Sequence, residues 1–297
     1  MSNKPLFKGV GTALITPFKN GEIDFDALND LVEAQLAGGV NALIAAGTTG
    51  EPATMDWDEN IAVIRAVVEK VHGRVPVIAG TGSNCTREAI EAAKRAKEIG
   101  ADAQLCVTPY YNKTSQAGLI AHYTALADSN TLPVIVYNVP SRTGLNILPE
   151  TLAKIAKHPN VIAVKEANAD MAQALEKVRL CGEDVAFYSG NDELAWPCMA
   201  CGFAGVISVV SNMLPRDMAD LTAAALRGDM AEATRRQLAL EPLIAALFSE
   251  TSPIPVKAAM AMMGMCQEEL RLPLVPMQDA TRAKLRAVMA DMGIGAK

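Results

Sequence analysis

Short runs of hydrophobic residues alternate along this chain with longer stretches in which hydrophobic residues recur every three or four positions. The short runs lie at residues 9–15, 40–47, 75–80, 103–109, 132–138, 161–167, 185–190 and 205–210. Their length and their content of β-branched residues predict buried strands, whereas the spacing of Leu28, Leu31, Val32 and Leu36 is that of one helix face. The pattern therefore predicts a strand–helix unit that is repeated about eight times.

The strand-like runs are continuously hydrophobic, which is typical of a parallel sheet covered on both faces. Gly39, Gly100 and Gly202 each end a helical stretch just before the next strand, where a left-handed cap favours glycine. Some eight units within roughly 225 residues predict a closed (β/α)8 TIM barrel. A doubly wound open sheet is the alternative, but Gly80-Thr81-Gly82 lacks the third glycine of a dinucleotide fingerprint and is interpreted as a tight turn.

After residue 226 the strand-like runs stop, and helical stretches follow at 230–249, 255–264 and 279–292. The segment Ser252-Pro253-Ile254-Pro255 predicts an extended break between the first two, because a proline disfavours the α conformation in the residue before it. We therefore expect a catalytic barrel over residues 1–226 and a C-terminal helical domain over 227–297. No low-complexity linker separates them, so they are expected to pack as one body.

Composition narrows the classes of protein that this chain can represent. Half of its residues are hydrophobic and its formal charge is −6, with no basic stripe for nucleic acid and no cationic amphipathic face for a membrane. The N-terminus lacks the apolar stretch of a signal peptide, so a cytoplasmic protein with small-molecule substrates is expected. His72, His122 and His158 lie far apart and Cys198 and Cys201 form an isolated pair, so no metal site is expected.

Candidate chemistry lies at the ends of the predicted strands, where a barrel forms its active site. These ends carry Thr48, Thr49, Tyr110, Tyr111, Tyr137, Arg142, Lys165 and Gly190. Lys165 stands out because it interrupts the apolar run VIAVKEAN, and a lysine almost never enters a core unpaired. Burial favours the neutral amine, which can attack a ketone to form a Schiff base. The alternative is a lysine that extends from the strand end into water.

Other strand-end residues favour the catalytic interpretation of Lys165 over that alternative. Tyr137 lies one strand earlier at the same level, where its phenol could move protons during imine formation, and Thr48 could relay them to Tyr111. A lone tyrosine there is more often a core residue, so only the combination favours catalysis. The planar guanidinium of Arg142 suits a carboxylate, although a surface ion pair is an equally good interpretation.

Taken together, the strand-end motifs resemble the pyruvate-dependent class I aldolase family that contains dihydrodipicolinate synthase and N-acetylneuraminate lyase. In order, they are GTALITPF, GTTGE, VTPYYN, YNVPSRTG, VKEA, YSGND, GVISV, PIPVKAA and LRLPLVP, and they span nearly the whole chain. The resemblance implies a (β/α)8 barrel with a C-terminal helical domain, commonly in a homotetramer built as a dimer of dimers. It implies no cofactor, because the covalent Schiff base with pyruvate serves as the electron sink.

The resemblance also implies roles for individual residues. Lys165 would form the Schiff base, Thr48 and Tyr137 would relay protons, and Tyr111 would complete the relay from a neighbouring subunit. Thr49, Gly190 and the backbone of Ile207 would lie near the bound pyruvate. Arg142 matches the arginine that receives the carboxylate of L-aspartate 4-semialdehyde in the synthases. The expected reaction is therefore the condensation of pyruvate with this semialdehyde to 4-hydroxy-tetrahydrodipicolinate, in diaminopimelate and lysine biosynthesis.

Two alternatives stay open at the level of sequence. A pyruvate aldolase or dehydratase acting on a 2-keto-3-deoxy sugar acid would keep Lys165 and change the acceptor. A non-catalytic, ligand-binding regulator on the same scaffold would bind without turnover and would tolerate loss of Lys165.

Feedback inhibition by L-lysine is a further expectation from the resemblance. Synthases that lysine inhibits use positions matching Ala53, Trp57, Asn60, Asn84, Glu88 and Tyr110. Asn84, Glu88 and Tyr110 fit that pattern, whereas Asn60 stands where a histidine is usual. Pro52 also departs from the family, which often has a serine after GTTGE.

Overall fold

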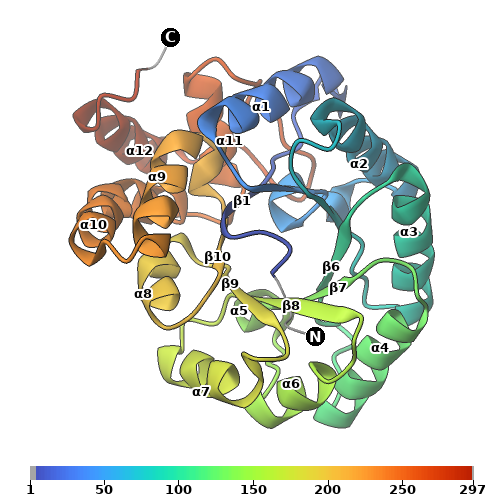
Figure 1. Ribbon diagram of the computed structural model, residues 1–297. Helices are drawn as coiled ribbons and strands as arrows, with labels where there is room; N and C mark the ends of the chain where they lie inside the picture. The colour runs from blue at the N-terminus through green and yellow to red at the C-terminus, as the bar shows by residue number, and fades with distance from the viewer. Residues whose placement is uncertain (1–4, 296–297) are drawn as a thin grey trace.

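The computed structural model describes residues 5–295 of the chain as a closed barrel of eight parallel strands surrounded by helices (Figure 1). Around the barrel the strands follow the order β1-β10-β9-β8-β7-β6-β5-β4. Their bounds are β1 (Gly9–Ala13), β4 (Ala42–Ala45), β5 (Val77–Gly80), β6 (Ala103–Val107), β7 (Val134–Asn138), β8 (Val161–Glu166), β9 (Ala186–Ser189) and β10 (Gly205–Ser208). The predicted TIM barrel is confirmed, and the open-sheet alternative is wrong because β1 pairs with both β4 and β10.

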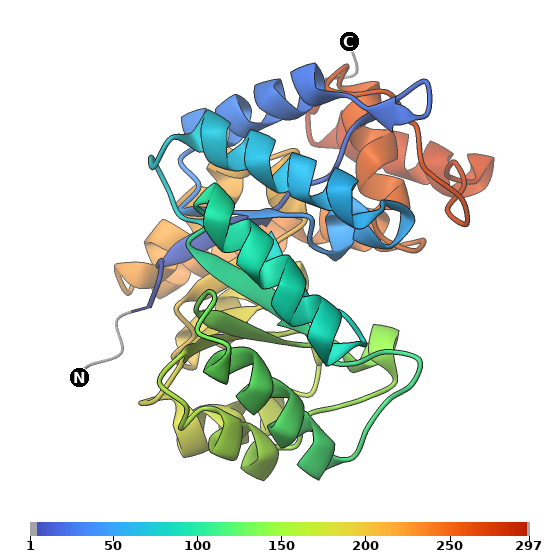
Figure 2. The same ribbon diagram turned by 90° about the vertical axis from the view of Figure 1, so that its right-hand side faces the viewer.

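Helices follow the strands and cover the outside of the barrel; Figure 2 shows the first four lying side by side on one flank. The barrel helices are α1 (Phe25–Gly38), α2 (Trp57–Val71), α3 (Thr86–Ile99), α4 (Gln116–Asp128), α5 (Pro140–Thr143), α6 (Pro149–Ile155), α7 (Met171–Cys181), α8 (Ala195–Ala200) and α9 (Pro215–Leu226). Short 3-10 turns follow three strand ends at η1 (Thr48–Gly50) and η2 (Pro52–Thr54), η3 (Asp192–Leu194) and η4 (Val210–Asn212). A two-stranded hairpin, β2 (Phe18–Lys19) and β3 (Glu22–Ile23), follows β1.

Three glycines end helices as the sequence predicts. Gly39 and Gly100 are the C-caps of α1 and α3, with φ of 86° and 99°. Gly202, with φ of 98°, follows the C-cap residue of α8. All three lie in the left-handed region, where a side chain would be strained, so each lets the chain turn back sharply into the next strand.

The hydrophobic core is divided by the sheet into an inner part and an outer part. Inside the barrel, Ile44, Ile78, Ile135 and Ile207 pack together from different strands. Phe7, which precedes β1, stacks on Tyr188 with ring centroids 4.2 Å apart and fills the N-terminal end of the barrel. Because that end is filled, the opposite end, where the strands finish, is the open mouth.

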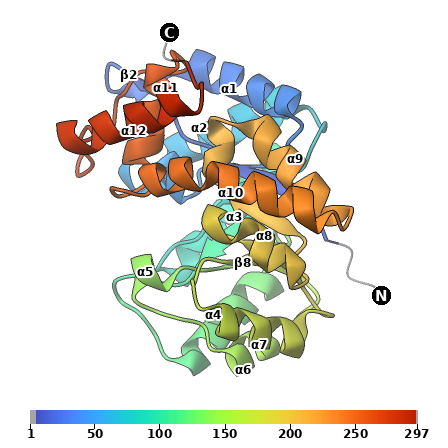
Figure 3. The same ribbon diagram turned by 90° about the vertical axis from the view of Figure 1, so that its left-hand side faces the viewer.

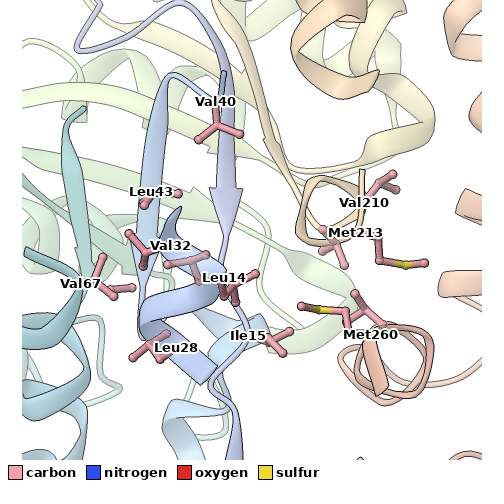
Figure 4. Close-up of a cluster of buried hydrophobic side chains, with 14 of the residues drawn as sticks. Leu14, Ile15, Leu28, Val32, Val40, Leu43, Val67, Val210, Met213 and Met260 are labelled. Carbon is pink, nitrogen blue, oxygen red and sulfur yellow. The ribbon is translucent and has the colours of Figure 1, made fainter. Parts of the chain in front are cut away.

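The C-terminal helices α10 (Met230–Leu247), α11 (Ile254–Met262) and α12 (Asp279–Asp291) confirm the three predicted helical stretches. In Figure 3, α10 runs along α8 and α9 and continues beside α12. Figure 4 shows Met260 of α11 beside Ile15 and Met213, which belong to the barrel part of the chain. The C-terminal helices therefore share one core with the barrel, as expected for one body, while the boundary after residue 226 stays a prediction.

The break between α10 and α11 differs from the prediction. Residues 248–253 form a turn instead of an extended segment. Ile254 already begins α11 although it precedes a proline, and Pro255 lies in the first turn of the helix, where its missing N–H leaves no bond unmade. Within residues 5–295, every helix is too short or too polar to cross a lipid bilayer.

Candidate active site

Lys165 lies near the end of β8 with its side chain inside the barrel mouth. Only 5% of its surface is exposed, which confirms the predicted burial. The residue opposite it on β7 is Tyr137, itself 6% exposed, and the Lys165 Nζ lies 4.5 Å from the centre of the tyrosine ring. The two residues that the sequence placed at one level are therefore in contact.

Lys165 differs from the other buried lysines of residues 5–295. Lys177 and Lys257 are each paired with a buried glutamate, at 2.6 Å and 2.5 Å. Within this part of the chain no carboxylate forms an ion pair with Lys165. An amine that is removed from water and left without a paired charge is suited to nucleophilic chemistry.

The next residue, Glu166, faces the opposite side of the sheet because successive strand residues alternate. Its carboxylate accepts hydrogen bonds from Lys177 Nζ at 2.6 Å and from Asn138 Nδ2 at 2.7 Å. Asn138 ends β7, so this buried group ties the end of β7 to the end of β8. The tie holds Tyr137 and Lys165 side by side.

Gly190, at the end of the neighbouring β9, leaves room for Lys165. Its N–H donates to the Glu166 carbonyl at 2.6 Å, so its backbone lies directly against β8. A Cβ atom at Gly190 would lie 2.7 Å from Ala167 Cβ and 3.1 Å from Lys165 Cε. Glycine is therefore required here by close packing beside the amine.

Asp192 follows Gly190 and is also buried. One of its oxygens accepts hydrogen bonds from the N–H groups of Val209 and Val210, at 2.9 Å and 3.1 Å, which connects η3 to the segment after β10. Burial raises the pKa of this carboxyl group, while hydrogen bonds and the charge of Lys165 oppose the rise. Asp192 is therefore a buried carboxyl group that interacts electrostatically with the Lys165 amine.

The turn that carries Thr48 and Thr49, called the threonine turn below, lies across the barrel mouth from Lys165. In the circular strand order β4 and β8 are four strands apart in both directions, so the segment after β4 lies opposite Lys165. This segment is η1, in which Thr49 is buried and Thr48 is half-buried. Thr16, from the segment after β1, donates its hydroxyl to the Gly50 carbonyl at 2.7 Å and holds the turn.

Arg142 lies on the short helix α5, after β7, with its side chain exposed. One of its guanidinium nitrogens donates to the Ser252 carbonyl at 2.9 Å, which leaves other donors of the group to bind an acid. Gly144 ends α5 with φ of 64°.

Ile207 is fully buried in β10.

Tyr111 does not join this group within its own chain. It lies in the loop after β6 with φ of 68° and with 92% of its surface exposed. The exposed phenol is thus outside the buried surroundings of Lys165 in the same chain.

The six residues matched to a lysine site fall into two groups. One group lies near the start of α3, and the other lies in η2 and the first turn of α2. Asn84 donates its amide to the Tyr110 carbonyl at 3.2 Å, and Glu88 accepts a hydrogen bond from Ser83 at 3.1 Å, so Asn84, Glu88 and Tyr110 lie on adjoining loops and the start of α3. Ala53 is exposed in η2 and Trp57 begins α2. Asn60, by contrast, is buried and donates its amide to the carbonyls of residues 52, 55 and 56.

A buried lysine beside a tyrosine at the mouth of a (β/α)8 barrel defines a site of the class I aldolase type. Residues 5–295 contain no group of three or more His, Cys, Asp and Glu side chains placed to hold a metal ion. The dihydrodipicolinate synthetase family model matches residues 6–292, and the chain belongs to this family.

Known proteins resemble the chain over almost its full length. The 4-hydroxy-tetrahydrodipicolinate synthase of Geobacter metallireducens is 51% identical over 286 residues, which are 96% of this chain and 99% of the relative. The crystal structure of dihydrodipicolinate synthase from Aquifex aeolicus superposes with a TM-score of 0.96 at 44% identity, covering 98% of this chain and 100% of that one.

Two further solved structures of related synthases contain a bound small molecule. The synthase from Acinetobacter baumannii, complexed with pyruvate, is 42% identical with a TM-score of 0.95, over 97% of this chain and 99% of that one. The synthase from Cyanidioschyzon merolae, with lysine bound, is 40% identical with a TM-score of 0.94, over 98% of this chain and 100% of that one.

Glu51, Asp192 and Lys257 are buried charged residues that the sequence predictions do not include. Lys257 interrupts the apolar stretch IPVKAAMAM just as Lys165 interrupts VIAVKEAN, so the same signal was available. Glu51 and Asp192 lie in strand-end segments whose burial depends on contacts with distant parts of the chain.

We expect Gly190→Ala to lower kcat/KM by roughly 10- to 100-fold, because a displacement of about 1 Å at a reacting group has that effect. The added methyl group would push against Ala167 and Lys165. Steady-state kinetics of the purified variant measure the change. Gly295→Ala, whose Cβ would meet nothing within 4 Å, is the matched control. Unchanged kinetics in Gly190→Ala would contradict the close packing around the amine.

Proposed function

We propose that the chain condenses pyruvate with L-aspartate 4-semialdehyde to 4-hydroxy-tetrahydrodipicolinate, as a lyase of diaminopimelate and lysine biosynthesis. The observation that carries the proposal is the buried, unpaired amine of Lys165 in contact with Tyr137. Membership of the family and the names of relatives about half identical to this chain support the choice of reaction.

The first half of the reaction activates pyruvate. After losing a proton, the amine of Lys165 attacks the keto carbon, and the resulting carbinolamine loses water to give an imine. The imine nitrogen withdraws electrons, so the pyruvate methyl group can lose a proton and become a nucleophilic enamine carbon. The protein contributes a nucleophile with little contact to water, which also protects the imine from hydrolysis.

The second half joins the two substrates. The enamine carbon attacks the aldehyde carbon of the semialdehyde, which forms the new carbon–carbon bond and a hydroxyl group. The amino group of the semialdehyde then attacks the imine carbon, closes the ring and releases the amine of Lys165. No electrons enter or leave, so the reaction requires no redox cofactor.

Proton transfers in both halves are assigned to Tyr137, Thr48 and Tyr111. Tyr137 is the group in contact with Lys165, and Thr48 lies on the turn opposite it. Tyr111 is exposed in its own chain, and we assign it to the site of a neighbouring subunit in a homotetramer built as a dimer of dimers. A phenol in such a relay can donate and accept a proton without a change in position.

The substrate carboxylates are assigned to two different elements. Thr49 would bind the carboxylate of pyruvate, because its turn lies opposite Lys165 and a three-carbon acid joined to Lys165 can direct its carboxylate there. Gly190 and the backbone of Ile207 would line the same small space. Arg142 would bind the carboxylate of the semialdehyde through its remaining guanidinium donors.

The test is pyruvate-dependent consumption of L-aspartate 4-semialdehyde, coupled to the reductase that uses the product and followed as loss of NADPH. We expect turnover in the wild-type chain and none above background in Lys165→Ala. Loss of a hydrogen-bonded charge corresponds to about 1.5–3 kcal/mol, so Arg142→Ala should raise the KM for the semialdehyde by roughly 10- to 100-fold and change that for pyruvate little. Turnover of a 2-keto-3-deoxy sugar acid instead of the semialdehyde would establish the alternative aldolase, and pyruvate binding without any turnover would indicate a regulator.

We also propose that L-lysine inhibits the enzyme at the surface formed by Asn84, Glu88 and Tyr110. A related structure has lysine bound, and these three residues lie on adjoining segments. The carboxylate of Glu88 suits the amino groups of lysine and the amide of Asn84 suits its carboxylate. Asn60, whose amide is engaged by three carbonyls, would act only by shaping the loop of residues 52–56.

Lysine titration of the coupled assay tests this second proposal. We expect activity to fall with lysine in the wild-type chain and the midpoint to rise by roughly tenfold in Glu88→Ala, as expected for loss of one charged hydrogen bond. A flat curve up to millimolar lysine would refute inhibition without affecting the assignment of the reaction.

A further inference from the structure

The turn that carries Thr48 and Thr49 ends at a residue with an unfavourable backbone conformation. Glu51 has φ of 57° and ψ of 41°, a left-handed conformation that is uncommon for residues with a side chain. It closes η1 by donating its N–H to the Thr48 carbonyl at 3.2 Å, and it begins η2. A conformation of this kind persists only where surrounding contacts enforce it.

The enforcing contact comes from the C-terminal helical part of the chain. One carboxylate oxygen of Glu51 accepts a hydrogen bond from Lys257 Nζ at 2.5 Å, and the other accepts one from the Arg271 N–H at 3.4 Å. Lys257 belongs to α11, and neither its side chain nor that of Glu51 is exposed to any degree. The Lys257 ammonium also lies 4.3 Å from the centre of the Phe18 ring.

Stability does not explain a charged pair at this position. Desolvation raises the pKa of the Glu51 carboxyl and lowers that of the Lys257 ammonium, and the attraction between them opposes both shifts. A buried pair of this kind is often no more stabilising than packed hydrophobic side chains of the same size. The pair instead fixes a position, because a short charged hydrogen bond determines where the Glu51 carboxylate and the Glu51 backbone lie.

A second contact extends the same arrangement to the acceptor side of the site. Arg142 donates to the carbonyl of Ser252, which lies in the turn just before α11. The segment from Ser252 to Lys257 therefore touches both elements to which substrate carboxylates are assigned. Figure 4 shows that α11 is itself held against the barrel by Met260, next to Ile15 and Met213.

We propose that Lys257 is a positioning residue that fixes the Thr48–Glu51 turn, and thereby the site for the pyruvate carboxylate, through its buried ion pair with Glu51. The inference rests on the proposed function, since it requires Thr49 to bind pyruvate. It makes the C-terminal helical part of the chain necessary for substrate binding although none of its residues is assigned a contact with the substrate.

The decisive variant is the double substitution Glu51→Gln/Lys257→Met in the full chain. It removes both buried charges, so it should fold with a Tm close to that of the wild type, whereas Lys257→Met alone leaves Glu51 unpaired and should lower the Tm. Both variants lose the charged hydrogen bond that fixes the position of residue 51. We expect the KM for pyruvate to rise by roughly 10- to 100-fold in each, with a smaller change in the KM for the semialdehyde.

Leu243→Ala is the matched control, because it removes a buried side chain from the C-terminal helix α10 and leaves both α11 and Glu51 unsubstituted. It should lower the Tm and leave the KM for pyruvate near the wild-type value. A wild-type KM in the double variant, or an equal rise in Leu243→Ala, would overturn the proposal and leave a purely structural pair.

Borohydride trapping distinguishes this proposal from the proposed function. If wild-type protein incubated with pyruvate is modified at Lys165, the reaction chemistry stands whatever the variants do. At a pyruvate concentration equal to the wild-type KM, both Lys257 variants should then be trapped to a much lower extent than wild type, and saturating pyruvate should restore trapping. Equal trapping of wild type and double variant at low pyruvate would refute the role of Lys257 alone.

Discussion

Removing an ammonium group from water is the constraint on which this structure depends most. Three lysines of residues 5–295 are buried, and two of them are neutralised by a glutamate at hydrogen-bonding distance. The unpaired one, Lys165, lies at the mouth of the barrel in contact with a phenol. The two pairs link different elements of the fold, and the exception is the amine to which the proposed covalent chemistry is assigned.

Closure of the barrel brings the buried Lys165 together with residues from the ends of other strands. Because the strands are parallel and joined in a ring, residues far apart in sequence finish at one mouth, and β4 and β8 present their ends to each other. Glu166 and Lys177 fix the β8 side of the mouth, while Glu51 and Lys257 fix the threonine turn on the other. One buried ion pair thus lies beside the end of β8 and another beside the threonine turn.

Much of this arrangement could be predicted from sequence, because the signals are local. Strand length, helical spacing and glycine caps depend on near neighbours, and the eight strands and three C-terminal helices lie where the pattern indicates. The β2–β3 hairpin around Asn20-Gly21 was missed although this dipeptide is typical of such turns. The Glu51–Lys257 pair could not be predicted, because its members are separated by 206 residues and meet only once α11 packs on the barrel.

Peptide mass analysis of the wild-type chain, after borohydride reduction in the presence of pyruvate, tests directly whether Lys165 is the nucleophile. The peptide containing Lys165 should gain the mass of one pyruvic acid less an oxygen atom, and omitting pyruvate or borohydride should abolish the gain. Lys177 and Lys257, whose amines are held by glutamates, should stay unmodified in the same digest. An unmodified Lys165, or modification of a paired lysine in its place, would contradict the assignment of the unpaired amine as the nucleophile.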